Sequence, residues 1–244
     1  FEILVVHEDE LYARQAAAAA FAEVDKLEAE LSRFIENSDV SRINNLPANQ
    51  PLLIGLAAFE CIQLSARICA ETNGAFDITI GSLLNCWRNE DASPRTPSQE
   101  QLNLARQHTG THLLKLNEVE HTVELLVAPV QVDLGGIGKG YAVDRMAELL
   151  HEWGVETALI SGGYSSVLAL DAPAGTKGWP ITLSDPLRRV ASQTRSSGGK
   201  RILNRLYLQG GALSGSGLQK GQHIIDPRTC LLYTSDAADE EDSV

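Results

Sequence analysis

The sequence has little positive charge, few cysteines and no long apolar run, and each shortage excludes a class of protein. It contains 20 Lys and Arg against 32 Asp and Glu, so the formal net charge is −12. We find no basic face, which argues against nucleic-acid binding. No apolar run reaches the roughly 18 residues that a transmembrane helix needs. With 244 residues, 43% of them hydrophobic, the chain can bury one good-sized core or two small ones.

The four cysteines do not have the spacing of a metal site. Cys61 and Cys69 stand on the same predicted helix, two turns apart, which is too far for a disulfide. Cys86 and Cys230 are isolated in the sequence. We interpret Cys61, Cys69 and Cys86 as small apolar core residues without a redox role.

Both ends of the chain look incomplete. It begins Phe1-Glu-Ile-Leu-Val-Val, inside a strand-like segment without a Met, so we expect the natural start to lie upstream. Residues 230–244, C-L-L-Y-T-S-D-A-A-D-E-E-D-S-V, resemble the translation of a sequencing-library adapter. We expect this segment to be a non-native, disordered tail, and a genuine disordered acidic tail is the alternative.

Hydrophobic periodicity predicts one mixed α+β domain over residues 1–229, with helices early and strands late. We expect Ser38 to cap a short helix, Ser98 with Gln101 to cap a longer one, and Asn73-Gly74 to end another. Residues Arg188 to Lys200 are expected to be a mobile loop. Long helices are predicted over residues 9–34, 55–72 and 98–108, and strands over residues 1–7, 111–116, 121–128, 156–161, 166–170, 179–184 and 203–208.

A cluster of glycines marks a strand-to-helix junction: Gly135, Gly136, Gly138 and Gly140. A strand is predicted before it, over residues 127–134, and an amphipathic helix after it, ending at Gly154. Glycine allows positive φ and close approach to a ligand, and a helix start attracts phosphate. Lys139 adds a positive charge. Neither the P-loop nor the dinucleotide fingerprint fits, and a turn that needs glycine for geometry alone remains the alternative.

Four separated segments resemble one family in the same order. The stretch V-D-L-G-G-I-G-K-G-Y-A-V-D (132–144) is similar to D-L-G-G-I-A-K-G-Y-A-x-D of the ApbE-type FAD:protein FMN transferases, with Gly138 in place of Ala. The other three segments are similar to M-S-x-Y…S-E-I-S-R-L-N, G-x-F-D-x-T-x-x-P-L-x-x-x-W and H-I-I-D-P-R-T-G. In this chain they read L-S-R-F (31–34) with N-S-D-V-S-R-I-N-N (37–45), G-A-F-D-I-T-I-G-S-L-L-N-C-W (74–87) and H-I-I-D-P-R-T (223–229).

The resemblance implies a fold and an activity. The fold would be a T-fold-like, two-layer α/β arrangement with antiparallel or mixed sheets. The activity would be Mg²⁺-dependent transfer of the FMN half of FAD to a Ser or Thr hydroxyl of a target protein, such as a respiratory redox subunit, with AMP leaving. Two alternatives stay open: a pyrophosphatase that splits FAD into FMN and AMP, and a non-catalytic FAD-binding module. The resemblance also implies a periplasmic or membrane-anchored location.

The resemblance assigns roles to individual residues. His223 and Asp226 fall at the catalytic positions, with His223 as a general base or phosphate-orienting group, although Asp226 before Pro227 could equally hold a turn. The backbone carbonyl of Gly138 falls at a metal-ligand position. The FAD-contacting positions fall on Phe34, Ala75, Phe76, Asp77, Gly135 and Tyr141.

The chain departs from the family pattern in three places. Residues 161–166, S-G-G-Y-S-S, stand where N-x-G-G-N is usual, and Ser214 to Gly217 stand where T-S-G is usual. The family also continues beyond D-P-R-T-G with an Asp and a Thr that bind the metal, and neither is found after Thr229. We therefore expect the 244-residue chain to bind FAD weakly and to transfer nothing.

Overall fold

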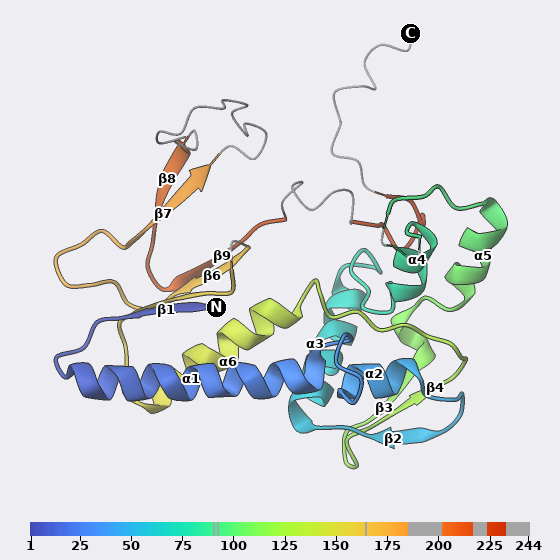
Figure 1. The fold of residues 1–244 in the computed structure, drawn as a ribbon, viewed down its shortest axis with the longest axis horizontal. Coiled ribbons are helices and arrows are strands. Elements are labelled where there is room, and N and C mark those ends of the chain that lie inside the picture. The colour runs from blue at the N-terminus through green and yellow to red at the C-terminus, as the bar shows by residue number, and fades with distance from the viewer. Residues whose placement is uncertain (90, 92, 164, 185–201, 217–223, 233–244) are drawn as a thin grey trace, which may run out of the picture. The chain divides into compact units, whose positions relative to one another are not determined.

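The structure, a computed structural model, describes residues 1–89, 91, 93–163, 165–184, 202–216 and 224–232 (Figure 1). The chain is mixed α+β with antiparallel sheets, as the sequence predicts. It divides into two compact units. The first unit combines Phe1–Asp25 with Lys139–Gly221, and the second combines Lys26–Gly138 with Gln222–Val244.

The first unit contains a four-stranded antiparallel sheet and two long helices. The helices are α1 (Glu10–Leu31), which continues into the second unit, and α6 (Gly138–Glu152). They lie on one face of the sheet (Figure 1). The strand order is β1 (Glu2–Val5), β5 (Ala158–Ser161), β6 (Ser166–Ala169) and β9 (Gly211–Ser214).

The core of the first unit follows from two periodicities. Alternate strand residues such as Ile160 and Leu168 point to the helices, while α1 presents alanines at spacings of four. Gly154 ends α6 as predicted: its φ is +69°, and its N–H donates to the carbonyl of His151. A separate antiparallel pair, β7 (Trp179–Ser184) and β8 (Ile202–Leu208), confirms two further predicted strands.

The second unit contains short helices and a three-stranded antiparallel sheet. The sheet order is β2 (Pro51–Leu53), β4 (Thr122–Leu125) and β3 (Leu114–Asn117). The helical elements are α2 (Asp39–Asn44), α3 (Leu56–Glu71), α4 (Gly81–Cys86), α5 (Gln99–Gln107) and the 3₁₀ turn η1 (Thr111–Leu113).

Local capping signals in the second unit are confirmed. The hydroxyl of Ser38 accepts the N–H of Ser41 at the start of α2. Ser98 and Gln101 form a reciprocal capping box at the start of α5. After α3, Asn73 and Gly74 both take positive φ, and the N–H of Gly74 donates to the carbonyl of Cys69.

The strand predicted over residues 127–134 is wrong. Gln131 forms only an isolated bridge with Ile80, and this segment contains no strand. Pro129 has no N–H to donate, and the polar backbone groups of Val132 are taken by a side chain, that of Asn44. Val130 and Val132 are nevertheless buried. The apolar residues of this segment therefore indicate burial and not pairing in a β-sheet.

The segment predicted to be a disordered tail begins with residues that pack. Cys230 is buried in a cluster with Leu83, Leu102 and Ile225, and its carbonyl accepts the indole N–H of Trp87. Leu232 forms an antiparallel bridge with Ile225. Residues 233–244, like the loop predicted from Arg188 to Lys200, lie outside the described part of the chain.

The interpretation of Cys61 as a small buried core residue is confirmed, whereas Cys69 and Cys86 are not fully buried. All four cysteines are free; Cys61 and Cys230 are buried, and Cys69 and Cys86 are half-buried. Burial raises the pKa of Cys61 to about 12, which leaves its thiol protonated and unreactive at neutral pH. Among the described residues no helix combines the length and apolarity needed to cross a membrane.

Candidate active site

The glycine-rich turn is closed by its own backbone. The carbonyl of Leu134 accepts two N–H groups, those of Ile137 and Gly138, at 3.0 and 2.7 Å. One carboxylate oxygen of Asp133 accepts the N–H of Gly135 at 2.7 Å. The turn leads directly into α6, and the first N–H groups of a helix have no intrahelical acceptor. Because the N–H groups of Ile137 and Gly138 are already bonded to Leu134, a ligand phosphate could use only N–H groups that follow in the first turn of α6.

Asn44 holds the residue before the turn from both sides. Its amide oxygen accepts the N–H of Val132 at 2.6 Å, and its amide nitrogen donates to the Val132 carbonyl at 3.0 Å. A side-chain amide thus replaces the neighbouring strand that the backbone of Val132 lacks. Asn44 lies in the N-S-D-V-S-R-I-N-N segment, so this contact joins two of the matched segments.

Arg33 joins the L-S-R-F segment to the same turn. Its Nε donates to the carboxylate of Asp133 at 3.1 Å, and the backbone N–H of Asp133 donates to the carbonyl of Ile78 at 2.7 Å. The guanidinium carbon of Arg33 lies 4.7 Å from the centroid of the Phe34 ring. That ring is 83% exposed, so it does not serve the core and is available to stack on a ligand.

The G-A-F-D-I-T segment supplies one ring and one buried carboxylate. A Cβ on Gly136 would lie 3.3 Å from the Phe76 ring, so glycine allows this ring to approach the turn backbone. Asp77 is buried, and its oxygens accept from the hydroxyl and N–H of Thr79 and the N–H of Thr111 at 2.6–2.9 Å. Ala75 is exposed beside them.

The D-P-R-T segment reaches the same region of the second unit. A Cβ on Gly74 would lie 3.9 Å from Cγ of Arg228. Arg228 holds Asp226 with two side-chain hydrogen bonds of 2.9 Å, and the N–H of Cys230 donates to the carbonyl of Asp226 at 2.8 Å. The D-P-R-T segment thus lies beside the start of the G-A-F-D-I-T segment.

Comparison with known proteins decides what this arrangement is. The model of the ApbE family matches residues 1–238. The chain belongs to the ApbE family. A curated relative from Klebsiella pneumoniae (strain 342), named FAD:protein FMN transferase, is 28% identical over 242 residues; the alignment covers 94% of this chain and 66% of the relative. The chain thus spans slightly less than two thirds of that relative's length.

Solved ApbE structures have the same fold. The apo form of the Pseudomonas stutzeri flavinyl transferase ApbE matches with a TM-score of 0.76 at 25% identity, covering 95% of this chain and 71% of that one. The ApbE protein from Thermotoga maritima matches with a TM-score of 0.74 at 26% identity, covering 93% and 74%.

The glycines of the ApbE turn do not work as expected. None of the four takes positive φ, so the expected left-handed backbone is wrong here. At two of them the need for glycine is steric: a Cβ on Gly135 would lie 2.8 Å from an oxygen of Asp133, and one on Gly136 3.3 Å from the Phe76 ring. At Gly138, where the family has Ala, a Cβ would meet Leu134 at an ordinary 3.7 Å, so this position accepts either residue.

Of the two residues predicted to be catalytic, His223 and Asp226, the structure describes only Asp226. His223 lies outside the described residues, and its role stays a prediction. Hydrogen bonds from Arg228 hold the pKa of Asp226 below its usual range. A carboxylate that is already paired and weakly basic is a poor general base, so this geometry favours Asp226 as the anchor of the D-P-R-T turn.

Arg228→Gln is expected to raise the pKa of Asp226 toward its ordinary value, because the guanidinium that favours the ionised form is lost. A depressed folded-state pKa contributes stability above the unfolded-state pKa, and that stability is lost as pH falls through the folded-state value. The stability difference between wild type and variant should therefore shrink below about pH 4. An NMR titration of the Asp226 carboxyl measures the shift, and identical titrations in both proteins would contradict it.

A metal ion needs more ligands than the described residues bring together. Within the described ranges no three His, Cys, Asp or Glu side chains cluster closely enough to hold one. Gly138 offers a backbone carbonyl, whereas Mg²⁺ prefers six oxygens. The described residues alone therefore do not fit a metal centre, and Gly138 as a ligand stays a prediction.

The two segments that depart from the ApbE pattern meet in the first unit. The carbonyl of Ser165 accepts the hydroxyl of Ser214 at 3.1 Å and the N–H of Gly215 at 3.0 Å. Lys139 donates to the hydroxyl of Ser165. The lysine charge predicted to serve a ligand thus already has a partner. Tyr141 is buried in α6, and its FAD contact stays a prediction.

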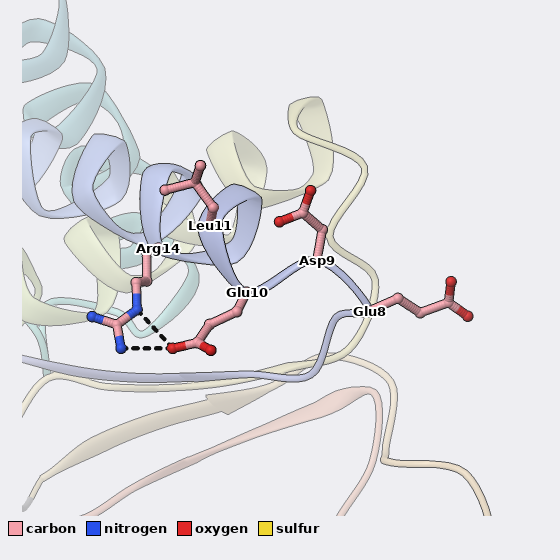
Figure 2. Close-up of a pocket in the computed structure, with 5 residues that line it drawn as sticks. All are labelled: Glu8, Asp9, Glu10, Leu11 and Arg14. Atoms are coloured by element: carbon pink, nitrogen blue, oxygen red, sulfur yellow. Dashed lines mark hydrogen bonds and ion pairs between the residues drawn. The ribbon is translucent and has the colours of Figure 1, made fainter.

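One hollow in the first unit contains none of the predicted site residues. It lies at the start of α1, has a volume of about 680 Å³ and is lined by Glu8, Asp9, Glu10, Leu11 and Arg14 (Figure 2). Arg14 is paired with Glu10 at 2.7 Å. The remaining carboxylates would repel a phosphate, and no predicted site residue lines the hollow.

Proposed function

We propose that this protein transfers the FMN moiety of FAD to a Ser or Thr hydroxyl of a target protein and releases AMP, with Mg²⁺ as the required cation. One observation carries the proposal: Asn44, Arg33 and Phe76 join two of the matched segments to the segment of the glycine turn, and Arg228 of the fourth lies beside Gly74. The name of the Klebsiella pneumoniae relative, FAD:protein FMN transferase, supports the same reaction.

The reaction moves one phosphoryl group. The acceptor oxygen forms a bond to the FMN phosphorus, the bond from that phosphorus to the bridging oxygen breaks, and AMP leaves with the bridging oxygen and the electron pair. The acceptor hydroxyl loses its proton, for which we propose His223 as the base. A divalent cation would offset the negative charge that develops on the departing phosphate.

The residues of the second unit would bind and orient FAD. The exposed ring of Phe34 and the ring of Phe76 offer apolar faces to the flavin. The N–H groups where the turn enters α6 offer donors to the pyrophosphate. The acceptor is proposed to be a protein with a Ser or Thr flavinylation site, such as a respiratory redox subunit, and the location proposed for this protein is periplasmic or membrane-anchored.

The test is to incubate the purified 244-residue chain with FAD and Mg²⁺, with and without a peptide carrying an acceptor Ser or Thr. AMP is measured by chromatography, and covalent flavin by in-gel fluorescence. AMP together with a fluorescent peptide supports transfer and contradicts the expectation that the 244-residue chain transfers nothing; both products should disappear with EDTA. AMP without any acceptor would replace transfer by hydrolysis. Bound FAD without AMP in either reaction would replace both by a binding module.

A further inference from the structure

The geometry points to Arg33 as a positioning residue that couples the flavin-stacking ring of Phe34 to the phosphate-binding turn. This inference rests on the proposed function, because it concerns how one FAD molecule is held at both its ends. The family pattern M-S-x-Y leaves the position of Arg33 open, so the coupling is a property of this chain and not of the pattern.

A short chain of contacts connects the ring to the turn. The guanidinium carbon of Arg33 lies 4.7 Å from the centroid of the Phe34 ring. Nε of Arg33 donates to one oxygen of Asp133 at 3.1 Å, and the other oxygen accepts the N–H of Gly135 at 2.7 Å. One carboxylate therefore links the guanidinium to the backbone of the turn.

The backbone of Arg33 is fixed as well as its side chain. Its carbonyl accepts the hydroxyl of Ser41, a buried residue of α2, at 3.1 Å. The side chains of Arg33 and Asp133 are only 27% and 15% exposed, so water screens their attraction less than at an open surface. The Phe34 ring, in contrast, is 83% exposed and is not held by the core.

A guanidinium suits this double task. It is planar, so its face can lie on an aromatic ring while its N–H edge binds a carboxylate. A lysine ammonium keeps the charge but has no planar face. Phe34 also lacks the hydroxyl of the tyrosine usual in the family, so its orientation depends on contacts to the ring face. Arg33 supplies that contact.

The first experiment needs no ligand. In the free protein, the NMR ring signals of Phe34, assigned by their loss in Phe34→Leu, should move in Arg33→Lys and also in Asp133→Asn. The matched control is Arg42→Lys, since Arg42 pairs with Asp39 on the adjoining helix and contacts neither Phe34 nor Asp133. Phe34 ring signals that do not move in Asp133→Asn would overturn the coupling.

The second experiment compares FAD with ADP, which lacks the flavin. Arg33→Lys should weaken FAD binding about threefold to tenfold more than ADP binding, the range expected when a cation–π contact is lost. In a Phe34→Leu background, the same substitution should weaken both ligands equally. Equal losses for both ligands with Phe34 intact would reduce Arg33 to a purely structural role.

The two experiments separate this inference from the proposed function. A wild-type chain that binds ADP as tightly as FAD would overturn the assignment of Phe34 to flavin stacking. A wild-type chain that binds neither ligand would overturn the proposed function. In both cases the ligand-free NMR result still confirms or overturns the link from Asp133 to Phe34.

Discussion

Replacing Asp77 with alanine is expected to lower the free energy of unfolding by about 3–5 kcal/mol, because each buried donor left without a partner costs about 1–3 kcal/mol. The carboxylate of Asp77 accepts the N–H and hydroxyl of Thr79 and the N–H of Thr111. All three donors would lose their acceptor. Chemical denaturation with urea, followed by circular dichroism, measures the loss.

A second substitution at Thr79 distinguishes a structural role of Asp77 from a direct contact with FAD. In a Thr79→Val background the cost of Asp77→Ala should fall, because one of the donors has been removed beforehand. Glu71, exposed at the end of α3, is the control, and Glu71→Ala should change stability by less than about 0.5 kcal/mol. An Asp77→Ala protein of unchanged stability that fails to bind FAD would contradict the structural role.

Asn44→Leu is expected to destabilise the protein by about 2–4 kcal/mol, since it leaves both polar backbone groups of buried Val132 without a partner. It should also abolish FAD binding, because the turn after Val132 loses its anchor. Asn44→Asp should cost about half as much, as it keeps the acceptor for the Val132 N–H. Urea denaturation and fluorescence titration with FAD measure the two effects.

The adjacent Asn45 provides a matched control for this substitution. Asn45 is exposed, and its amide donates to the carbonyl of Ser41 within the same short helix. Asn45→Leu should therefore cost less than about 1 kcal/mol and leave FAD affinity unchanged. Equal destabilisation by the two leucine variants would show that Asn44 does not anchor the turn.

Elements decided by neighbouring residues could be predicted from the sequence. The capping box of Ser98 and Gln101 and the end of α3 at Asn73 and Gly74 depend on contacts within a few residues. The strand prediction over residues 127–134 failed because the hydrogen-bond partner of Val132, Asn44, lies 88 residues away in the sequence. Apolar alternation cannot reveal such a partner.

The same limit applies to the candidate site. Resemblance identified Phe34, Phe76 and Gly135, and the structure holds them in one unit. It gave no role to Arg33 or Asn44, although both stand inside the matched segments, because their partners lie in another segment. Asp77 was predicted to face FAD, yet its carboxylate is occupied by donors of its own fold.

The division of the chain into units has a consequence for its synthesis on the ribosome. Residues 26–138 of the second unit emerge as one continuous stretch, whereas β1 of the first unit pairs with β5, Glu2 opposite Ser161. Strand β1 must therefore wait until its partner leaves the exit tunnel. Until then its open edge can pair with other chains, so chaperone demand should be highest during translation of residues 26–157.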